Sequence, residues 1–390
     1  MSNEDTLAVT ESSSSTLLSY LWPVMYRCGQ VVFGLLAVAA GLLYVQQESL
    51  LYFPTVGNIP RHNAQNPRGY RHPGERGLEY SSHIISNNAD GKQIHAWFLP
   101  HPTCRDEPRK LPTVLFFHGN AGNIGLRIPN AVEFLKRVEA NFVLVEYRGY
   151  GDSPGDVRPT EAGLKSDAIA AWEYCRNELA KQESALVDPN QIYVFGRSLG
   201  GAVAFSLAAH AEAQGTPLRG LIAENTFTSI SDMVDQVLPF LSPIKRFVLR
   251  IGWNSLEIIQ QGRIQATPML FLAGDADALV PHVHMQQLRD AAHLATMPRG
   301  IVPVFHVIRG GTHNESWLQG GRPYWQSFSD FINNTSKSGG SIGAVSTPAF
   351  TTSTATTTTG TSSIPLMSNQ FAGMARDALS NSRKSKDKNT

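Results

Sequence analysis

The chain has 390 residues, of which 42% are hydrophobic and 17% are charged, with 33 Lys and Arg against 32 Asp and Glu. This charged fraction lies below the roughly 25% of an average soluble domain, which indicates that part of the chain does not face water. A net charge of +1 excludes the basic footprint of a nucleic-acid-binding protein. Cys28, Cys104 and Cys175 are too few for a disulfide framework or a tetrahedral zinc site, so we expect no metal and no other cofactor.

An uncharged segment near the N-terminus predicts a single membrane-spanning helix. Residues 28–47 carry no charge, and about 20 apolar residues cover the roughly 30 Å hydrocarbon layer of a bilayer. Aromatic side chains suited to the two membrane interfaces flank the segment, namely Trp22, Tyr26, Tyr44 and Tyr52. A cleavable signal peptide would have a shorter core nearer the start, whereas a buried core helix stays open as an alternative. Residues 1–27 are then an N-terminal tail.

The flanking charges give a weak prediction of orientation. Arg27 adjoins the N-terminal side of the span, and the first basic residue beyond it is Arg61. This asymmetry favours a cytoplasmic N-terminus, with the rest of the chain across the membrane. We expect a single-pass protein of the endoplasmic reticulum or another endomembrane, or of the plasma membrane. The glycosylation sequons at Asn333 and Asn334 would be usable only in that orientation.

The C-terminal segment has the composition of a disordered tail. Residues 338–363 consist largely of Ser, Thr and Gly, which cannot bury enough apolar surface to order themselves. We therefore predict a disordered Ser/Thr-rich tail over residues 336–390. The folded domain is expected over residues 75–335.

Within this domain, short apolar runs alternate with amphipathic segments. Such runs are typical of strands buried on both faces, and six occur, at residues 114–117, 142–145, 192–195, 220–223, 269–272 and 304–308. Predicted helices between them include 130–138, 160–179, 202–211 and 282–292. This alternation predicts an α/β fold whose mostly parallel sheet has helices on both faces. Two earlier segments, 80–85 and 94–99, could add an antiparallel edge. In such a sheet, functional side chains gather at the carboxyl ends of the strands.

A glycine-flanked serine follows the third of these predicted strands. The string Gly196-Arg197-Ser198-Leu199-Gly200-Gly201 lies between a strand and a helix. Glycines on both sides let the strand and the helix approach closely, so that the serine hydroxyl is presented above the sheet on a strained turn. Because this context is the one the motif requires, we interpret Ser198 as a nucleophile and not as a plain structural turn.

A serine nucleophile needs a base, and the base needs an orienting acid. His313 lies in a glycine-rich loop after the last predicted strand, at the same sheet edge as Ser198. Asp275 and Asp277 both follow the preceding strand, and either carboxylate could orient the imidazole. The chain order serine, aspartate, histidine is that of an α/β-hydrolase fold and differs from the order in the other serine triad folds.

The oxyanion of a tetrahedral intermediate needs two backbone donors at this edge. The residue after the nucleophile, Leu199, supplies one N–H in such a fold, and the loop after the first long strand supplies the other. We assign the second donor to Asn120, within the string His118-Gly119-Asn120-Ala121-Gly122-Asn123. His118 is interpreted as a loop-stabilising side chain rather than as a second base.

Several strings together resemble one family. The loop at 118–123, Tyr147-Arg148-Gly149-Tyr150-Gly151, the serine motif, Glu224-Asn225-Thr226-Phe227 and Gly311-Thr312-His313-Asn314 are similar to the alpha/beta hydrolase domain-containing protein 13 group. That group includes fungal bud-emergence and plant wavy-growth relatives. The resemblance implies a membrane-anchored serine hydrolase and selects Asp277 over Asp275 as the third triad residue. The Ser/Thr-rich tail has no counterpart in the family pattern.

An apolar insert suggests what the site accepts. Residues 229–264 contain many large apolar side chains and two prolines, and we predict a short helical cap there, although ordinary sheet-covering helices explain some of those residues. With the anchor, this favours a lipid or an acylated protein as substrate over a charged metabolite, and the substrate-binding residues are unknown. The predicted function is hydrolysis of acyl esters or thioesters. The alternatives are a serine peptidase-like hydrolase and a non-catalytic membrane scaffold in cell polarity.

Overall fold

The computed structural model describes residues 3–57, 59–105 and 107–337, and it contains an eight-stranded sheet of order β1-β2-β4-β3-β5-β6-β7-β8. Strands β1 and β2 pair with each other, and β2 with β4, in antiparallel fashion, whereas all the other pairs are parallel. The strand bounds are β1 Ser81–Ser86, β2 Gln93–Leu99, β3 Leu111–Phe117, β4 Asn141–Val145, β5 Val187–Arg197, β6 Gly220–Glu224, β7 Met269–Gly274 and β8 Val304–Ile308. The six apolar runs lie in β3 to β8, and the two earlier segments form the predicted antiparallel edge as β1 and β2.

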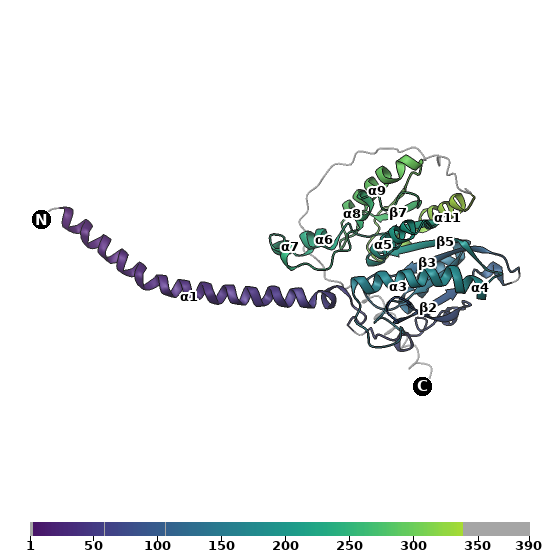
Figure 1. Cartoon of the computed structure of the whole chain (residues 1–390), viewed down its shortest axis with the longest axis horizontal. Coiled ribbons are helices and arrows are strands. Elements are labelled where there is room, and N and C mark those ends of the chain that lie inside the picture. Colours follow the sequence, from purple (N-terminus) through teal and green to yellow (C-terminus); the bar gives the residue numbers. More distant parts are fainter. Residues whose placement is uncertain (1–2, 58, 106, 338–390) are drawn as a thin grey trace, which may run out of the picture.

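Helices cover both faces of the sheet (Figure 1). One apolar core joins the sheet to α3, α5, α8 and α9, and a second joins its other face to α2 and α11. The helix bounds in the domain are α2 Ile128–Arg137, α3 Glu161–Tyr174, α4 Ala180–Gln182, α5 Leu199–Ala213, α6 Ile230–Val237, α7 Lys245–Val248, α8 Ser255–Gln260, α9 His282–Thr296, α10 Ser316–Gln319 and α11 Gly321–Lys337. Because the parallel strands are buried on both faces, they read as continuous apolar runs rather than as alternating ones.

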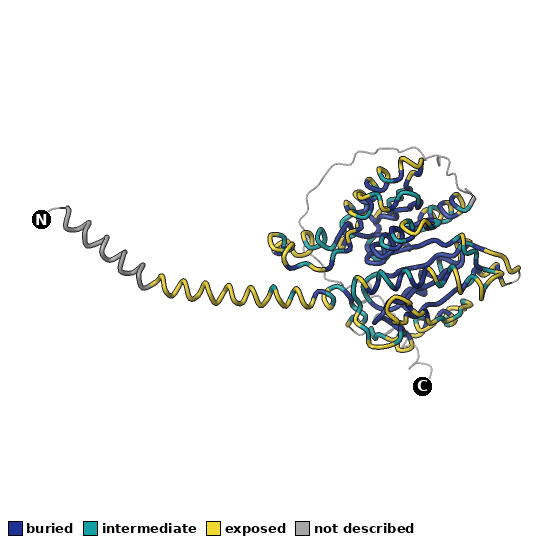
Figure 2. Tube along the Cα trace, in the orientation of Figure 1, coloured by how far each residue is buried: buried dark blue, intermediate teal, exposed yellow. Residues whose placement is uncertain are grey.

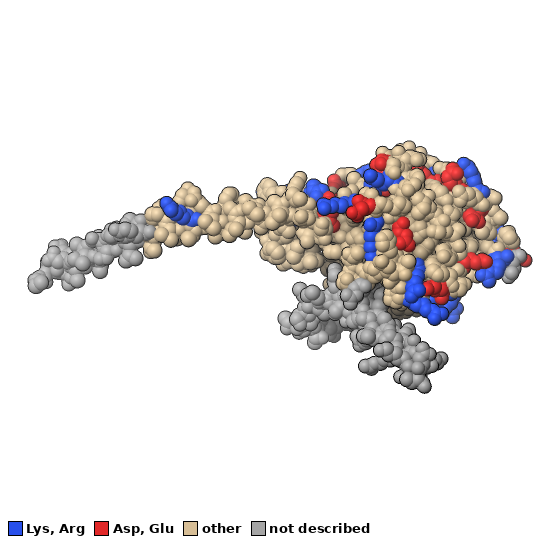
Figure 3. Space-filling model, turned by 90° about the horizontal axis from the view of Figure 1, so that it is seen from below, with Lys and Arg blue, Asp and Glu red and all other residues tan. Residues whose placement is uncertain are grey.

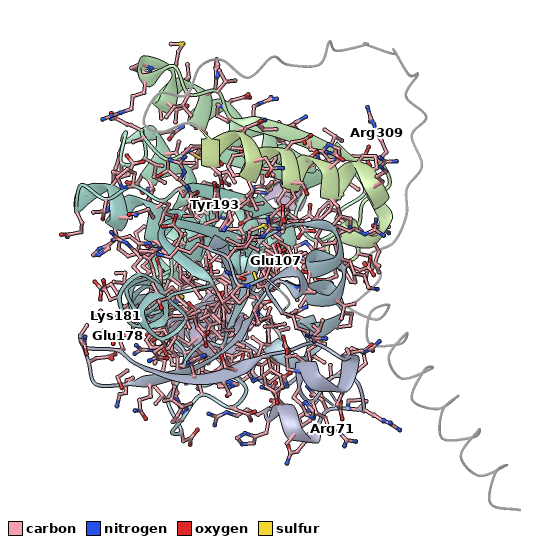
Figure 4. All side chains as sticks on the ribbon, turned by 90° about the vertical axis from the view of Figure 1, so that its right-hand side faces the viewer. Arg71, Glu107, Glu178, Lys181, Tyr193 and Arg309 are labelled. Carbon is pink, nitrogen blue, oxygen red and sulfur yellow. The ribbon has the colours of Figure 1, made fainter. Side chains whose placement is uncertain are left out.

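The middle of the sheet is fully buried, as Figure 2 shows by the dark strands at the centre of the domain. Tyr193 of β5, labelled near the centre of Figure 4, exposes none of its side chain. Its hydroxyl lies 2.8 Å from Oγ1 of Thr335 and so ties α11 to the sheet. Charged pairs such as Lys181 and Glu178, 3.2 Å apart, lie by contrast at the surface.

Helix α1, Asn3–Leu51, projects from the domain (Figure 1). Residues 21–51 have a mean hydropathy of 2.0 over their most apolar window, and none of that window is buried in the structure. The helix is thus long and apolar enough to cross a membrane. It extends beyond the predicted span of 28–47 at both ends, into the segment interpreted as an N-terminal tail, because helical backbone need not stop where the apolar pattern stops. The predicted tail at 336–390 lies, from residue 338 on, outside the described residues.

The insert predicted as a cap has two parts. Helix α8 packs against α5 and α9 and is an ordinary sheet-covering helix, as its buried Ile259 indicates. Helices α6 and α7, joined by a short 3-10 turn at Pro239–Leu241, lie instead on the side of the domain from which α1 projects (Figure 1). We call the segment from Ile230 to Val248 the cap.

Candidate active site

The pairing register brings the carboxyl ends of the central parallel strands level with one another. Phe117 of β3 pairs with Gly196 of β5, and Arg197 pairs with Glu224 of β6. Gly274 of β7 pairs with Ile308 of β8 at the same edge. The loops that follow these residues carry the candidate catalytic side chains.

Ser198 stands on a strained turn between β5 and α5. Its φ of 54° and ψ of −121° lie in a region that side-chain-bearing residues rarely adopt. Hydrogen bonds hold this backbone: the Ser198 amide donates to the Glu224 carbonyl at 2.9 Å, and the Thr226 hydroxyl donates to the Ser198 carbonyl at 2.7 Å. The hydroxyl is therefore presented in one fixed position at the head of helix α5.

Two flanking glycines make this turn possible because backbones touch where their side chains would be. A Cβ on Gly196 would lie 2.0 Å from the Gly200 carbonyl oxygen, and one on Gly200 would lie 1.9 Å from the Phe117 carbonyl oxygen. Both distances are far below van der Waals contact. The glycines of the serine motif are thus required by the close approach of strand and helix, as the motif predicts.

The three residues predicted to form a triad lie in one chain of hydrogen bonds. Nε2 of His313 lies 2.9 Å from Oγ of Ser198, and Nδ1 of His313 lies 2.7 Å from Oδ2 of Asp277. The Asp277 side chain is almost wholly buried. Its second oxygen accepts the amides of Leu279 and Val280, both at 2.9 Å, which holds the carboxylate in place.

Asp275, the alternative carboxylate, faces away from the histidine. Its Oδ1 accepts the amide of Gly310 at 2.6 Å, and its Oδ2 lies 3.1 Å from the guanidinium of Arg309. Arg309 itself is at the surface (Figure 4). Asp275 therefore joins the turn after β7 to the turn after β8, and Asp277 alone of the two contacts His313.

The predicted oxyanion donors lie on the two backbone segments that flank the nucleophile. Leu199 is the first residue of α5, where amides have no partner within the helix and the helix dipole is positive. The loop bearing Asn120 passes close by, since a Cβ on Gly119 would lie 3.6 Å from Cβ of Ser198. Hydrogen bonds from Tyr150 at 2.8 Å and from the Phe53 amide at 2.9 Å fix the Asn120 carbonyl.

Comparisons with known proteins decide the family. Residues 107–261 match a family model described as serine aminopeptidase, S33. The alpha/beta hydrolase domain-containing protein WAV2 of Arabidopsis thaliana is 32% identical over 328 residues, which cover 81% of this chain and 96% of WAV2. Protein bem46 of Schizosaccharomyces pombe is 33% identical over 320 residues, covering 82% and 96%.

This chain belongs to the alpha/beta hydrolase family of WAV2 and bem46. The predicted resemblance is thereby confirmed. A further relative, named as an uncharacterised membrane protein of Saccharomyces cerevisiae, is 32% identical over 316 residues, covering 80% of this chain and 98% of its own. An esterase of Pyrococcus furiosus superposes with a TM-score of 0.53 at 15% identity, over 73% of this chain and 97% of the esterase. That likeness confirms the α/β-hydrolase fold.

In this alpha/beta hydrolase, His118 lies behind the Asn120 loop and is fully buried. Its Nδ1 lies 2.7 Å from the Gly119 carbonyl oxygen, and its Nε2 lies 3.1 Å from a carboxylate oxygen of Glu146. The other Glu146 oxygen accepts the amide of Ile124 at 3.0 Å. His118 thus contacts its own loop rather than Ser198, as its interpretation as a loop-stabilising residue requires.

A buried ion pair underlies the nucleophile of this hydrolase. Nε of Arg197 donates to Oε2 of Glu224 at 2.7 Å, and both side chains are almost completely shielded from solvent. Burial raises the pKa of Glu224, because it costs the carboxylate its hydration. The pair joins the ends of β5 and β6 directly beneath Ser198.

Asn225 is a site residue whose role the sequence left open. Its φ of 46° is left-handed, a conformation that Asn tolerates better than most residues. Its Nδ2 lies 3.1 Å from the carbonyl oxygens of both Thr312 and His313, and its Oδ1 accepts the Gly274 amide at 2.8 Å. One side chain therefore ties the histidine loop to the ends of β6 and β7. The signal in the sequence is a polar residue directly after a buried strand.

No group of three or more His, Cys, Asp or Glu side chains is placed to hold a metal ion within the stretches that the structure describes. The side chains that the site brings into contact are a hydroxyl, an imidazole and a carboxylate. A hydroxyl in contact with an imidazole that contacts a carboxylate can act as a nucleophile toward an electrophilic carbonyl carbon.

Proposed function

We propose that this alpha/beta hydrolase is a membrane-anchored serine hydrolase that cleaves acyl esters or thioesters. The observation that carries the proposal is the continuous contact from Ser198 through His313 to Asp277, with the serine on a strained strand-to-helix turn. The membrane anchor is α1, whose apolar window is wholly unburied by the domain. One relative in the family is itself named as a membrane protein.

The proposed reaction proceeds through an acyl-enzyme. Oγ of Ser198 attacks the acyl carbonyl while Nε2 of His313 takes its proton, and Asp277 holds the imidazole tautomer and stabilises the imidazolium. The amides of Leu199 and Asn120 donate to the oxyanion. The imidazolium then protonates the departing alkoxide or thiolate, and a water activated by His313 releases the acid and restores Ser198.

Apolar surroundings favour an acyl substrate. The cap beside α1 exposes large apolar side chains, and the anchor would keep the site close to lipid. A lipid ester, as cleaved by a lipase or lysophospholipase, and a thioester on a lipid-modified protein both fit this setting. Hydrophobic linings are common to many small-molecule sites, so the acyl class follows mainly from the anchor.

A second candidate is peptide cleavage, because the matching family model is described as a serine aminopeptidase. The same three side chains serve both reactions, so only the substrate separates them. The test is a comparison of full-length protein on medium- and long-chain acyl esters, acyl thioesters and aminoacyl amides of the same chromophore.

We expect turnover of esters and thioesters, with no turnover of the amides. His313→Ala should lower it by roughly 10⁴- to 10⁶-fold while the thermal midpoint stays nearly unchanged. Preferred cleavage of aminoacyl amides would support the peptidase instead. Activity that survives His313→Ala would contradict the assigned base.

A further inference from the structure

The cap carries a cluster of exposed apolar side chains. Phe240 exposes 73% of its surface and Phe247 exposes 68%, and the neighbouring exposed members are Val237, Leu238 and Ile244. We call these five side chains the cap face. Figure 2 shows the tip of α6 and α7 as largely exposed. Contiguous exposed aromatic and aliphatic groups are uncommon on soluble surfaces and mark contacts with a protein or a membrane.

The cap is joined to the last turns of α1 by a buried glutamine. Nε2 of Gln47 donates to the Val248 carbonyl at 2.6 Å, and its Oε1 accepts the amides of Arg250 and Ile251 at 2.8 and 3.1 Å. Glu48 forms a two-pronged ion pair with the Arg250 guanidinium, at 2.5 Å for each contact. The chain is therefore fixed against α1 at the last residue of α7, Val248, and at Arg250 and Ile251 just beyond it, and we call this set of contacts the joint.

The position of this joint along α1 sets its depth relative to a bilayer. The uncharged stretch 28–47 at a rise of 1.5 Å per residue matches the hydrocarbon thickness of about 30 Å. In Figure 3 the length of α1 between the basic side chain toward its outer end and the domain is correspondingly free of charged side chains. Gln47 and Glu48 then lie at the membrane interface, and so does Arg250, whose guanidinium also stands 5.7 Å from the ring of Tyr44.

We propose that the cap face inserts into the bilayer surface at which α1 leaves the membrane on the domain side. The domain then contacts the bilayer through the cap as well as through its anchor. Phe247 lies three residues before Arg250, on the short helix that packs against α1. Arg246, whose guanidinium stands 4.5 Å from the Phe247 ring, is placed to meet lipid phosphates beside the inserted ring.

The occupant of the cap face is thus the lipid bilayer rather than a second protein. This inference rests on the membrane anchoring in the proposed function and deepens it. The cap begins just after the end of β6, whose Glu224 carbonyl holds the Ser198 amide. Insertion of the cap therefore brings the sheet edge that bears Ser198 close to membrane acyl chains, which makes a membrane-embedded acyl ester the expected substrate class.

The experiment measures depth of insertion without requiring turnover. Full-length protein carrying Cys28→Ser, which leaves only the buried Cys104 and Cys175, receives a single labelling cysteine and an environment-sensitive nitrobenzoxadiazole label. It is reconstituted into vesicles of phosphatidylcholine with a minor fraction of phosphatidylserine. Nitroxide groups on the lipid acyl chains quench a label only when it enters the bilayer.

The labelled positions are chosen as matched exposed apolar residues. Phe247→Cys tests the cap face, and Leu36→Cys, within α1, reports the anchor itself. Leu294→Cys is the control: Leu294 is 67% exposed, but it lies near the end of α9 and thus at the sheet edge opposite to the site.

We expect a blue shift and strong nitroxide-dependent loss of emission at positions 36 and 247, with neither at 294. A label at 247 that behaves like the one at 294 would overturn the cap contact. A blue shift at 247 that nitroxide lipids do not quench, and that grows with protein density, would overturn it in favour of a second copy. Absence of quenching at both 36 and 247 would overturn the membrane anchoring by α1 together with the cap contact.

The same labels in a Ser198→Ala background separate this inference from the proposed function. Quenching at 247 should be equal with and without the nucleophile, because insertion depends on the cap and not on chemistry. An enzyme that turns over esters while position 247 stays in water would refute the cap contact alone. Insertion at 247 in a protein that keeps Ser198 but shows no turnover would refute the proposed activity alone.

Discussion

Ser198 occupies a backbone conformation that costs a side-chain-bearing residue of the order of 1–3 kcal/mol. Two hydrogen bonds offset that cost: the Thr226 hydroxyl donates to the Ser198 carbonyl, and the Ser198 amide donates to the Glu224 carbonyl. The benefit is positional: the hydroxyl lies 2.9 Å from the imidazole before any substrate arrives. In the proposed reaction, such preorganisation would lower the activation barrier, because little rearrangement would be left for the reaction itself.

Asn225 provides a test of this positioning at the level of one side chain. We expect Asn225→Ala to lower kcat for ester hydrolysis about 100-fold with little change in KM, since misplacement of a base by about 1 Å has an effect of that size. The physical reason is that the His313 and Thr312 carbonyls lose their shared donor, which frees the histidine loop. Steady-state kinetics on a soluble ester measure the change.

Asn225→Gly separates the side chain from the backbone strain. Glycine adopts the φ of 46° at no steric cost. The free energy of unfolding of Asn225→Gly should therefore exceed that of Asn225→Ala. The kcat of Asn225→Gly should nevertheless fall as far as that of Asn225→Ala, because both variants lack the amide side chain. A glycine variant with the kcat of the wild type would show that the Asn225 side chain does not position the histidine.

The residue types at the site could be predicted from the sequence, but not all their partners. Each of Ser198, Asp277 and His313 follows a recognisable buried strand, and parallel strands bring such loops together. The pattern alone did not distinguish Asp275 from Asp277, because both occupy one turn. Their hydrogen bonds, to Gly310 and to His313 respectively, depend on side-chain directions that only the folded loop defines.

At the scale of elements, the strand β5, the turn and the helix α5 act as one packed unit. We expect Gly200→Ala to destabilise the fold by about 3 kcal/mol, the upper part of the range for overpacking, because the new methyl would meet the Phe117 carbonyl oxygen at 1.9 Å. Helix α5 would have to move away from β3. Urea unfolding followed by circular dichroism gives the free energy of unfolding.

The matched control for this substitution is Gly119→Ala. A Cβ there meets its nearest atom at an ordinary 3.6 Å, and the backbone of Gly119 is not left-handed. Its free energy of unfolding should stay within about 0.5 kcal/mol of the wild type, as at positions without steric conflict. Equal stability of the two variants would contradict the close packing of α5 on β3.

Elements with a clear hydrophobic pattern could be predicted from the sequence, whereas elements defined by tertiary contacts could not. The buried strands read as continuous apolar runs, and the antiparallel edge formed by β1 and β2 was also foreseen from two earlier segments. The division of the insert into a sheet-covering α8 and a projecting cap was not. Both parts contain several large apolar side chains, so composition could not say which of them face the sheet and which, such as Phe240, stay exposed.

At the scale of the whole molecule, α1, the proposed anchor, is held to the domain by a joint rather than by a loose linker. Gln47 and Glu48 bind the segment after the cap, the Tyr52 hydroxyl accepts the indole N–H of Trp253 at 3.0 Å, and the Phe53 amide binds the Asn120 carbonyl. The anchor thus reaches the loop that bears a proposed oxyanion donor. The contacts of Gln47, Glu48 and Tyr52 connect residues about 200 positions apart, and no local pattern in the sequence predicts them.

The stability of the joint between α1 and the segment after the cap should fall at acidic pH. The hydrogen bond and charge of Arg250 hold the pKa of Glu48 below its ordinary value. For a carboxylate whose pKa is lowered by folding, the stabilisation is complete above the unfolded pKa of about 4.3 and is lost as pH falls through the lowered value. We therefore expect the Arg250 and Ile251 amides to lose hydrogen-exchange protection, relative to the central strands, as pH falls below about 4.

Glu48→Gln is the control for that profile. It keeps the length of the side chain but removes the titrating group, so protection of these two amides should be lower at neutral pH and nearly flat across the acidic range. Superimposable profiles for the wild type and the variant would assign the acid sensitivity to other carboxylates, such as Glu161, which binds the Gly252 and Trp253 amides.

The central claim is that Ser198 is an activated nucleophile, and covalent labelling tests it most directly. Full-length protein in detergent or vesicles is treated with a fluorophosphonate probe, and mass spectrometry locates the adduct. We predict a single adduct on Ser198, labelling that slows strongly in His313→Ala, and none at this position in Ser198→Ala. A correctly folded wild-type protein that stays unlabelled, or that carries the adduct on another residue, would contradict the account and favour a non-catalytic scaffold.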